Sequence, residues 1–429
     1  MRPTIRFAPA GLFLLALAAL PAPAHSPDAA LRDRVAQLVE RLDAPKQEAR
    51  DSAEKALITL GAKALPFLPD SIKPGTERGD RVERVRVALR EAVDRTNTGA
   101  SKITIKGQGI RLTEAVRMLQ SQSGNTITDL REQMGADATN PALDLDLVAV
   151  PFFEALDQVA EKGGVLPSYF AGDGSIGLMV GGAAMNPAYI RRAGPFRVAL
   201  KQIGGMRDFQ SGAATANVQF EIAWEPRLRP MLLALKVDEI EVIDDQGRKV
   251  LPDVMDSATD TPLQPGTPAA EVNLNLAAPD RTAKSLAKLK VKAEVTVPDA
   301  LRTFKFANLA APGQTAKQGD IAVTHSSFEV DEQLWKVGVE VAYPGDGPAF
   351  ESYRQGLFNN RIWLQKADGS RFDLNGGFSN TGNDGGKIGF EYVFVDAPDT
   401  PKDYQLVYVT PSKVIQVPLE FTFENVPLP

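Results

Sequence analysis

The residue types that most often carry protein chemistry are scarce in this chain. It contains no cysteine and only two histidines, His25 and His325. Thiol catalysis, redox relays and cysteine-based zinc sites are therefore excluded, and one internal histidine cannot form the usual histidine-rich zinc site. Ser326 follows His325, but adjacent side chains of a strand point to opposite faces, so the two do not form a nucleophile–base couple. The sequence predicts a surface histidine at this position.

Acidic residues occur in close pairs, as acid–base catalysis or a metal ion would need. Asp144 and Asp146 are two residues apart in an alternating apolar–polar segment, which places both on one face of a strand. We expect that face to be the solvated one. Asp244 and Asp245 lie at a predicted turn and are expected to serve the turn itself. Neither pair predicts a catalytic site.

Two glycine-containing segments are loosely similar to ligand-binding loops. Residues 375–386 include Asn380, Asn383 and Asp384, whose oxygen atoms suit calcium, but the order of residues in a calcium loop is missing. Lys106–Gly109 (KGQG) precedes a predicted helix but lacks the spacing of a phosphate-binding loop. The sequence thus identifies no catalytic, cofactor-binding or metal-binding residue, and it predicts a protein without enzyme activity and without a cofactor.

Length and charge narrow the class of protein further. At roughly 150 residues per domain, the 429 residues suggest about three domains. The 48 basic and 54 acidic residues give a formal net charge of −6. Nucleic-acid-binding modules concentrate positive charge on one face, so this balance argues against a nucleic-acid partner.

The first residues have the pattern of an export signal. Arg2 and Arg6 precede an apolar stretch, Gly11–Leu20, and the following Pro21–Ala24 (PAPA) offers cleavage between small residues. The stretch is shorter than the ~20 residues that span a bilayer, and no later segment predicts an anchor. We expect a signal peptide over residues 1–24 and an exported protein, periplasmic or extracellular and soluble after cleavage. A buried N-terminal helix is the alternative.

Residues 25–99 have the spacing of amphipathic helices. Ser26-Pro27-Asp28 is a typical helix start, and apolar residues then recur every three or four positions. The pattern predicts a small antiparallel helical layer. Its apolar residues are Leu31, Val35, Leu38 and Leu42, then Ala49, Ala53, Leu57 and Leu60, then Leu65, Leu68 and Ile72, and finally Val82, Val85, Leu89 and Val93.

Part of this helical segment resembles a HEAT-type repeat. The marks are Arg50 and Ala53 in the first helix, the turn at Leu60-Gly61, and Ala64–Leu68 (ALPFL) opening the second helix. The resemblance covers one or two repeats, whereas a free-standing solenoid needs about three. A generic helical bundle is the alternative.

Residues 101–183 repeat a pattern at an offset of 40 residues. Two alternating segments, Ile103–Lys106 and Leu143–Asp146, predict half-buried strands. Each precedes a helix with matching apolar positions, and each helix ends at glycine, which suits a left-handed cap. The two strand–helix–strand units have the plan of a compact α/β sandwich. Their remaining strands are predicted at 126–129, 166–171 and 176–180.

The repeated pattern carries a resemblance to a known family. An alternating strand, L-x-E-A-V-x-x-L and S-G, followed by a second strand, F-x-E-A-L-x-x-V and G-G, resembles the secretin and TonB short N-terminal domain. That resemblance implies a periplasmic module at residues 100–185 that makes protein–protein contacts without catalysis. The chain departs from the family in context, because no secretin pore domain or outer-membrane β-barrel follows. Duplication of a common unit in an unrelated fold is the alternative.

From about residue 186 the apolar spacing changes to that of strands. Trp224, Trp335 and Trp363 lie in alternating segments and are expected to fill a core. Residues 252–271 are predicted to form a loop and residues 311–320 a linker. The predicted strands are 218–224, 237–242, 272–276, 291–297, 328–341, 361–366, 389–395, 404–409 and 415–423, with turns at 245–247 and 367–369.

These patterns together predict a multi-domain α+β protein. After the signal peptide come a HEAT-like helical segment (25–99), a duplicated βαβ α/β sandwich (100–185) and two antiparallel β-sandwich domains (186–310 and 314–429). The two sandwiches resemble immunoglobulin-like domains in broad architecture only.

The function expected from this organisation is binding. We expect an exported, non-enzymatic interaction or scaffold protein of the bacterial cell envelope. Its partners are expected to be other envelope or extracellular proteins, with no nucleic acid and no integral membrane anchor in the mature chain. One alternative is an accessory protein of a secretin or TonB-type outer-membrane complex. Another is a carbohydrate-binding or hydrolytic β-sandwich protein, which would need carboxylates facing each other across a cleft.

Overall fold

A computed structural model describes residues 27–69, 75–135, 138–181, 185–252, 259–263, 266–319, 321–343, 360–384, 387–397 and 400–429. The predicted signal peptide and His25 lie outside the described residues. The chain forms two compact units, which divide between Asn97 and Thr98.

The first unit consists of helices around a small apolar core. The helices are α1 (Pro27–Arg41), α2 (Gln47–Thr59) and α3 (Glu77–Thr98), with a 3₁₀ helix, η1 (Ala62–Phe67), between α2 and α3. The predicted helical layer is therefore confirmed. The buried residues at the predicted spacing are Val35, Leu38, Leu42, Ala53, Leu57, Leu68, Val82, Val85 and Leu89.

The expected third α-helix is only a short 3₁₀ helix. Pro66 lies inside η1 and has no N–H to continue an α-helical ladder. Gly61, with φ of 72°, separates η1 from α2. The segment that the HEAT resemblance assigned to the opening of a second helix, Ala64–Leu68, therefore belongs to this 3₁₀ helix and its C-cap instead of to an α-helix. Ile72 lies outside the described residues.

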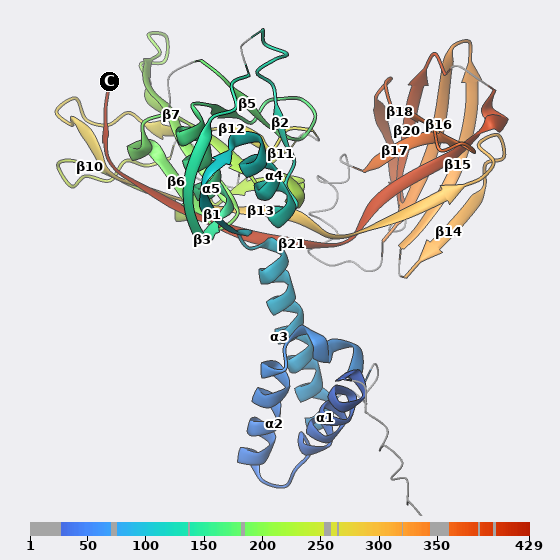
Figure 1. Cartoon of the computed structure of the whole chain (residues 1–429). Coiled ribbons are helices and arrows are strands. Elements are labelled where there is room, and N and C mark those ends of the chain that lie inside the picture. The colour runs from blue at the N-terminus through green and yellow to red at the C-terminus, as the bar shows by residue number, and fades with distance from the viewer. Residues whose placement is uncertain are drawn as a thin grey trace, which may run out of the picture. The chain divides into compact units, whose positions relative to one another are not determined.

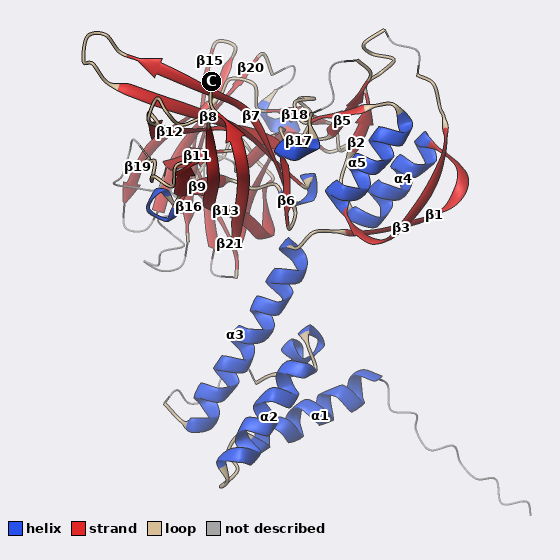
Figure 2. Cartoon of the chain, turned by 90° about the vertical axis from the view of Figure 1, so that its left-hand side faces the viewer, coloured by secondary structure: helices blue, strands red, loops and turns tan. Residues whose placement is uncertain are grey.

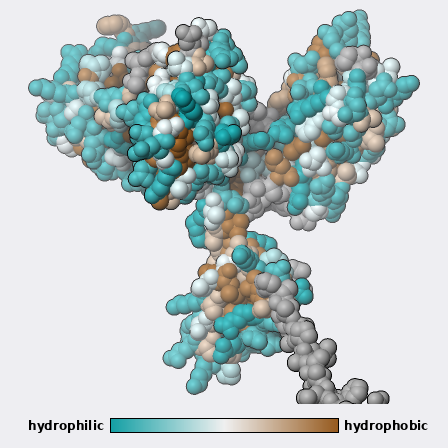
Figure 3. Space-filling model, viewed as in Figure 1, coloured by the Kyte–Doolittle hydropathy of each residue, from teal (hydrophilic) through white to brown (hydrophobic). Residues whose placement is uncertain are grey.

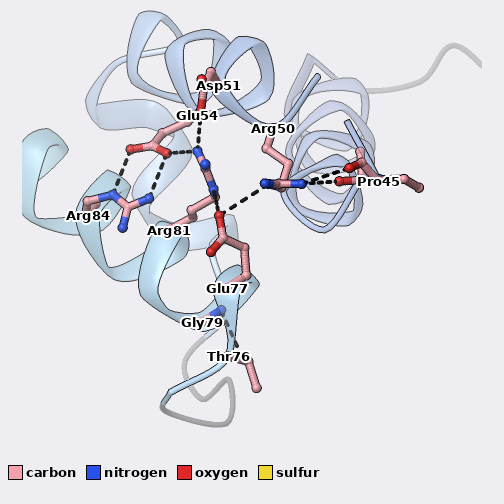
Figure 4. A network of polar contacts seen from close by, with 10 residues as sticks. Pro45, Arg50, Asp51, Glu54, Thr76, Glu77, Gly79, Arg81 and Arg84 are labelled. Atoms are coloured by element: carbon pink, nitrogen blue, oxygen red, sulfur yellow. Dashed lines mark hydrogen bonds and ion pairs between the residues drawn. The ribbon is translucent and has the colours of Figure 1, made fainter. Parts of the chain in front are cut away.

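A buried arginine joins α2 to α3 (Figure 4). The guanidinium of Arg81 donates to Asp51 at 2.9 Å, to Glu54 at 2.6 Å and, from Nε, to Glu77 at 2.6 Å. The hydrogen bond from Arg81 lowers the pKa of Glu77. Arg84 adds a second contact to Glu54 at 3.1 Å. The first unit therefore combines an apolar core with a charged cluster in which the buried cation is paired.

The second unit begins with the two predicted strand–helix–strand copies. The first copy is β1 (Lys102–Arg111), α4 (Leu112–Ser123) and β2 (Ile127–Asp129). The second is β3 (Ala142–Pro151), α5 (Phe152–Gly163) and β4 (Leu166–Ser168), followed by β5 (Ile176–Met179). Gly124 and Gly164 occupy the left-handed caps with φ of 72° and 65°, as the sequence predicts.

The two copies combine into one core. Strand β1 pairs with β3 antiparallel, while β5 pairs with β2 in parallel and with β4 antiparallel. Helices α4 and α5 pack side by side (Figure 2). Leu112, Leu119, Phe152 and Leu156 are buried between the helices and the strands. Each copy supplies one strand to the β1–β3 ribbon, so neither copy completes this core alone.

The remaining strands form three antiparallel sheets. One has the order β12-β8-β7-β6 and another the order β14-β15-β16-β20-β19. The third runs β11-β9-β13-β21-β17-β18, and β10 also pairs with β13. Their bounds are β6 (Ile190–Ala193), β7 (Phe196–Arg207), β8 (Ala214–Trp224), β9 (Leu232–Leu235), β10 (Glu241–Asp244), β11 (Thr259–Pro262), β12 (Ala269–Ala277), β13 (Ser285–Phe306), β14 (Gln314–Gln318), β15 (Ile321–Asp331), β16 (Leu334–Ala342), β17 (Arg361–Lys366), β18 (Arg371–Asp373), β19 (Phe378–Asp384), β20 (Lys387–Val395) and β21 (Tyr404–Pro427).

Two long strands, β13 and β21, connect two groups of sheets. They pair with each other from Ser285 and Pro427 to Phe306 and Leu406. Figure 1 shows this ribbon passing from one group of strands to the other. Residues 417–426 pack in the core formed with residues 196–297, whereas Tyr404–Tyr408 pack with residues 304–394. The expected boundary between residues 310 and 314 does not account for this return of the last strand.

Several predicted loops are strands. The expected linker at 311–320 contains the edge strand β14, and the expected loop at 252–271 contains β11 and the start of β12. The predicted strand 328–341 is two strands, because the chain turns at Glu332, whose φ is 53°. Edge strands such as β14 bury few side chains, so they lack the apolar alternation from which strands are predicted.

The architecture is α+β, with N-terminal helices followed by many mostly antiparallel sheets. The predicted class is confirmed at this level. Among the residues that the structure describes, no helix is long and apolar enough to cross a membrane. Hydrophilic residues cover most of the surface visible on each unit in Figure 3.

Candidate functional site

The acidic pair on β3 is on the solvated face, as predicted. Asp144 accepts a hydrogen bond from the backbone N–H of Gly109 at 2.9 Å, and Asp146 forms an ion pair with Lys106 at 3.4 Å. The segment Lys106–Gly109 is part of strand β1 and pairs with β3, so it does not form a loop that surrounds a phosphate. Both features stabilise the β1–β3 ribbon.

The second acidic pair stabilises its turn. Asp244 is buried and accepts hydrogen bonds from the backbone N–H groups of Gln246 and Arg248, both at 2.9 Å, and from Arg248 Nε at 2.7 Å. Asp245 accepts from the N–H of Lys284. The prediction of turn chemistry is confirmed.

His325 is not on the surface, and this prediction is wrong. Its side chain on β15 is fully buried (0% exposed), with the ring of Phe306 6.0 Å away. Neither ring nitrogen makes a hydrogen bond with the described residues. Burial lowers the pKa of His325, and contact with the backbone of Ser327 offsets only part of that effect. The alternation Ile321, Val323, His325 places the imidazole on the inner face of the strand.

The candidate calcium segment also forms a strand, β19. Asn380 accepts from the N–H of Gly382 at 2.8 Å, while the side chains of Asn383 and Asp384 lie outside the described part of the structure. No group of three or more His, Cys, Asp or Glu residues in the described ranges is placed to hold a metal ion.

The tryptophans divide into two kinds. Trp224 and Trp335 are buried, as predicted. Trp363 is half-buried, and its ring contacts two guanidinium groups, that of Arg371 at 4.3 Å and that of Arg361 at 5.9 Å. Arg361 also lines a pocket, and this pocket is the candidate functional site.

The pocket lies within the second unit and has a volume of about 320 Å³. We call it the arginine pocket. Its lining comes from the αβ copies, the end of β8 and the segment after it, the segment before β12, the β13–β21 ribbon and the first residue of β17. The lining residues are Gly124, Thr126, Asp173, Gly174, Trp224, Pro226, Arg227, Arg229, Pro230, Met231, Gly266, Thr267, Pro268, Pro298, Leu301, Arg361, Val409 and Pro411.

A buried carboxylate next to the arginine pocket holds two of its walls together. Glu225 is fully buried (0% exposed) and accepts from the N–H of Ser101 at 2.8 Å and from Asn125 Nδ2 at 3.0 Å. Arg227 Nε donates to the same carboxylate at 2.7 Å, and its guanidinium also donates to the carbonyl of Gly99. A buried charge with this many partners fixes the geometry around it.

A backbone hydrogen bond between two glycines also stabilises the pocket wall. The N–H of Gly174 donates to the carbonyl of Gly266 at 2.7 Å. A Cβ on Gly266 would lie 3.3 Å from the carbonyl oxygen of Gly172, and the φ of Gly266 is 87°. Larger residues would strain this approach, so glycine is required here for both space and backbone conformation.

Two arginines of the pocket, Arg229 and Arg361, differ from Arg227 in their surroundings. No ion pair joins Arg229 or Arg361 to an acid among the described residues. Partial desolvation lowers the pKa of Arg361, repulsion from Arg229 and Arg371 lowers it further, and attraction by Asp373 offsets part of this effect. Arg227 differs, because Glu225 neutralises it. The pocket can therefore attract an anion through Arg229 and Arg361.

Arg229 has an unusual backbone. Its φ is 48° and ψ 55°, in the left-handed region that favours glycine and asparagine. Its neighbours Leu228 and Pro230 are buried, and the N–H of Met231 donates to the carbonyl of Thr296 at 2.8 Å. These anchors hold the residue in a strained conformation, which is common at binding sites.

Sequence reasoning missed this site completely. Its residues extend from Gly124 to Pro411 and form no motif, and its arginines are single charges in unremarkable segments. The one local signal is Glu225-Pro226-Arg227, a charged pair directly after a strongly apolar strand. That position would have indicated a buried ion pair.

Comparison with known proteins identifies no relative. No family model matches the chain. No curated protein matches it either. One solved structure, described as the conserved domain protein from Bacillus anthracis, aligns with 55% of this chain and 89% of its own at 9% identity and a TM-score of 0.16. A TM-score this low supports no argument about fold or function.

Proposed function

We propose that the chain is an exported, non-enzymatic interaction protein of the bacterial cell envelope, which binds another macromolecule at the arginine pocket of its second unit. The observation that carries the proposal is the pair Arg229 and Arg361 beside a preorganised wall, two charges that form no ion pair with an acid in the part of the chain that the structure describes. Preorganised sites bind more tightly, because little conformational entropy is lost on binding. Structural ion pairs would have neutralised these charges.

The residues around the two arginines suit recognition. The pocket lining places apolar and proline side chains around a few polar groups, which is the usual composition of a binding site. The acid of the lining, Asp173, accepts hydrogen bonds from the N–H of Ser175 at 2.9 Å and from its hydroxyl at 2.6 Å. These bonds lower the pKa of Asp173 and keep it ionised.

The αβ module favours a second candidate, docking in a secretin or TonB-type outer-membrane complex. Strands β1 and β3 pair only with each other among the described strands, so each offers an edge to a partner strand. Val148 on β3 is 57% exposed. We further propose that the module is of the secretin and TonB short N-terminal type, and that the later sheets form immunoglobulin-like sandwiches.

Affinity capture tests the proposal. Mature chain and its Arg229→Asn variant are immobilised in parallel and exposed to envelope extract. We expect specific proteins to be retained by the mature chain and depleted on the variant. Equal retention of proteins by both chains would show that the arginine pocket is not part of the binding surface. A Val148→Asp variant distinguishes the outer-membrane alternative, because it places a charge on the exposed face of β3 without touching the pocket lining. Loss of retention on this variant, with full retention on Arg229→Asn, would favour docking through the αβ module.

A further inference from the structure

We propose that the arginine pocket captures the C-terminal carboxylate of a peptide whose last side chain is apolar. This inference rests on the proposed function and names the chemistry of the partner. Carboxylates form paired, charge-assisted hydrogen bonds with guanidinium groups, which give direction as well as energy. Arg229 and Arg361 are the two donors.

The charge balance favours an occupant with one negative charge. Arg229 and Arg361 are positive, Asp173 is negative, and Glu225 neutralises Arg227. One net positive charge remains in the lining. A terminal carboxylate balances it, whereas a phosphate group with close to two negative charges would leave an excess beside Asp173.

Few backbone N–H groups in the pocket lining are available to bind an anion. Five of the lining residues are prolines, Pro226, Pro230, Pro268, Pro298 and Pro411, which have no N–H to donate. Phosphate loops instead surround their ligand with backbone N–H groups. An anion here is therefore held by side-chain guanidinium groups, as in planar carboxylate recognition.

The apolar part of the lining suits a side chain next to that carboxylate. Trp224 and Met231 are buried, and Leu301 and Val409 come from the paired strands β13 and β21. The volume, about 320 Å³, is at the lower end for ligand pockets. It suits one terminal residue better than a long segment.

The strain at Arg229 supports a binding function and also supplies a clean variant. A left-handed φ is easier for asparagine than for arginine. Arg229→Asn should therefore fold at least as stably as the natural chain while losing the guanidinium. A residue retained for stability alone would behave in the opposite way.

Calorimetric titration of the full mature chain tests the inference. The probes are acetyl-Gly-Gly-Leu with a free carboxylate, the same peptide as its C-terminal amide, and inorganic phosphate as a competitor. We expect the acid to bind at least about tenfold more tightly than the amide, which corresponds to the loss of a charge-assisted pair. Arg229→Asn and Arg361→Gln should each weaken binding of the acid by about the same factor.

The matched control is Arg117→Gln, which removes one exposed positive charge from α4, outside the pocket lining. It should leave binding unchanged, and the melting temperature of Arg229→Asn should not fall. Equal binding of acid and amide, or displacement of the peptide by phosphate at equal concentration, would overturn the inference. If envelope proteins were still retained in that case, the proposed function would stand and only the chemistry of the partner would be wrong.

Discussion

The carboxylate of Glu225 accepts a hydrogen bond at 2.8 Å from the backbone N–H of Ser101, which lies 124 residues earlier in the chain. With Asn125 and Arg227 as further donors, this buried carboxylate links the αβ copies to the sheets that follow. The arginine pocket lies beside this link. Its shape therefore depends on a polar contact between two segments far apart in sequence.

Replacing this carboxylate should destabilise the second unit. Glu225→Ala leaves the donors of Ser101, Asn125 and Arg227 without their acceptor, and breaking a buried pair costs about 3–5 kcal/mol. Denaturant unfolding measures the loss. Glu271→Ala, at an exposed position on β12, is the control and should change the free energy of unfolding by less than about 0.5 kcal/mol. Similar losses for both variants would contradict the role of Glu225.

The buried imidazole of His325 predicts an acid-sensitive fold. Because burial lowers its pKa in the folded state, the unfolded chain binds the proton more readily near pH 6.5, the ordinary value for histidine. Stability from this group is present above that pH and is lost as pH falls. We expect the free energy of unfolding to fall from pH 7.5 to 5.5 by less in His325→Leu than in the natural chain. Parallel curves for the two proteins would show that His325 does not contribute.

A charge in the αβ core should prevent that module from folding. Leu156 on α5 is buried in the core of the two copies, so Leu156→Asp introduces an unpaired charge that costs several kcal/mol. Val148→Asp makes the same kind of change on the exposed face of β3 and should be nearly neutral. Thermal melts followed by circular dichroism compare the two. An unchanged melt for Leu156→Asp would refute the common core.

The charged cluster of the helical unit predicts unequal effects of two neighbouring arginines. Arg81 is buried and contacts Asp51, Glu54 and Glu77, whereas Arg84 is mostly exposed. Arg81→Met removes the buried cation that contacts all three carboxylates and should lower the melting temperature of the helical unit. Arg84→Met should lower it much less. The reverse order would contradict the role of the buried Arg81 guanidinium as the main stabilising charge of the cluster.

The sequence predicts those elements whose signal is local. The caps at Gly124 and Gly164 and the inner faces of β1 and β3 follow from neighbouring residues. The turn at Asp245-Gln246-Gly247 also follows locally, since Gly247 donates to Asp244 at 3.1 Å. Edge strands such as β14 have no such signal, because a partner strand rather than a buried face specifies them.

The arginine pocket was beyond sequence reasoning for a related reason. Arg229 and Arg361 are 132 positions apart, and their neighbourhood arises only when β17 pairs with β21. A single chain shows the charge of each residue but not the absence of an acid beside it. The burial of His325 could be predicted from the sequence, because its two-residue spacing from Val323 places it on the inner face of the strand.

The path of β21 has a consequence for how the second unit folds. Tyr404 and Leu406 complete one hydrophobic core and Phe421 and Phe423 complete another, although both pairs belong to a single strand. During synthesis, neither core can close until this strand has emerged, so the growing chain must keep two apolar surfaces apart from other proteins for most of its length. Because these pairings join residues far apart in sequence, we expect slow folding in which both cores form in one cooperative step.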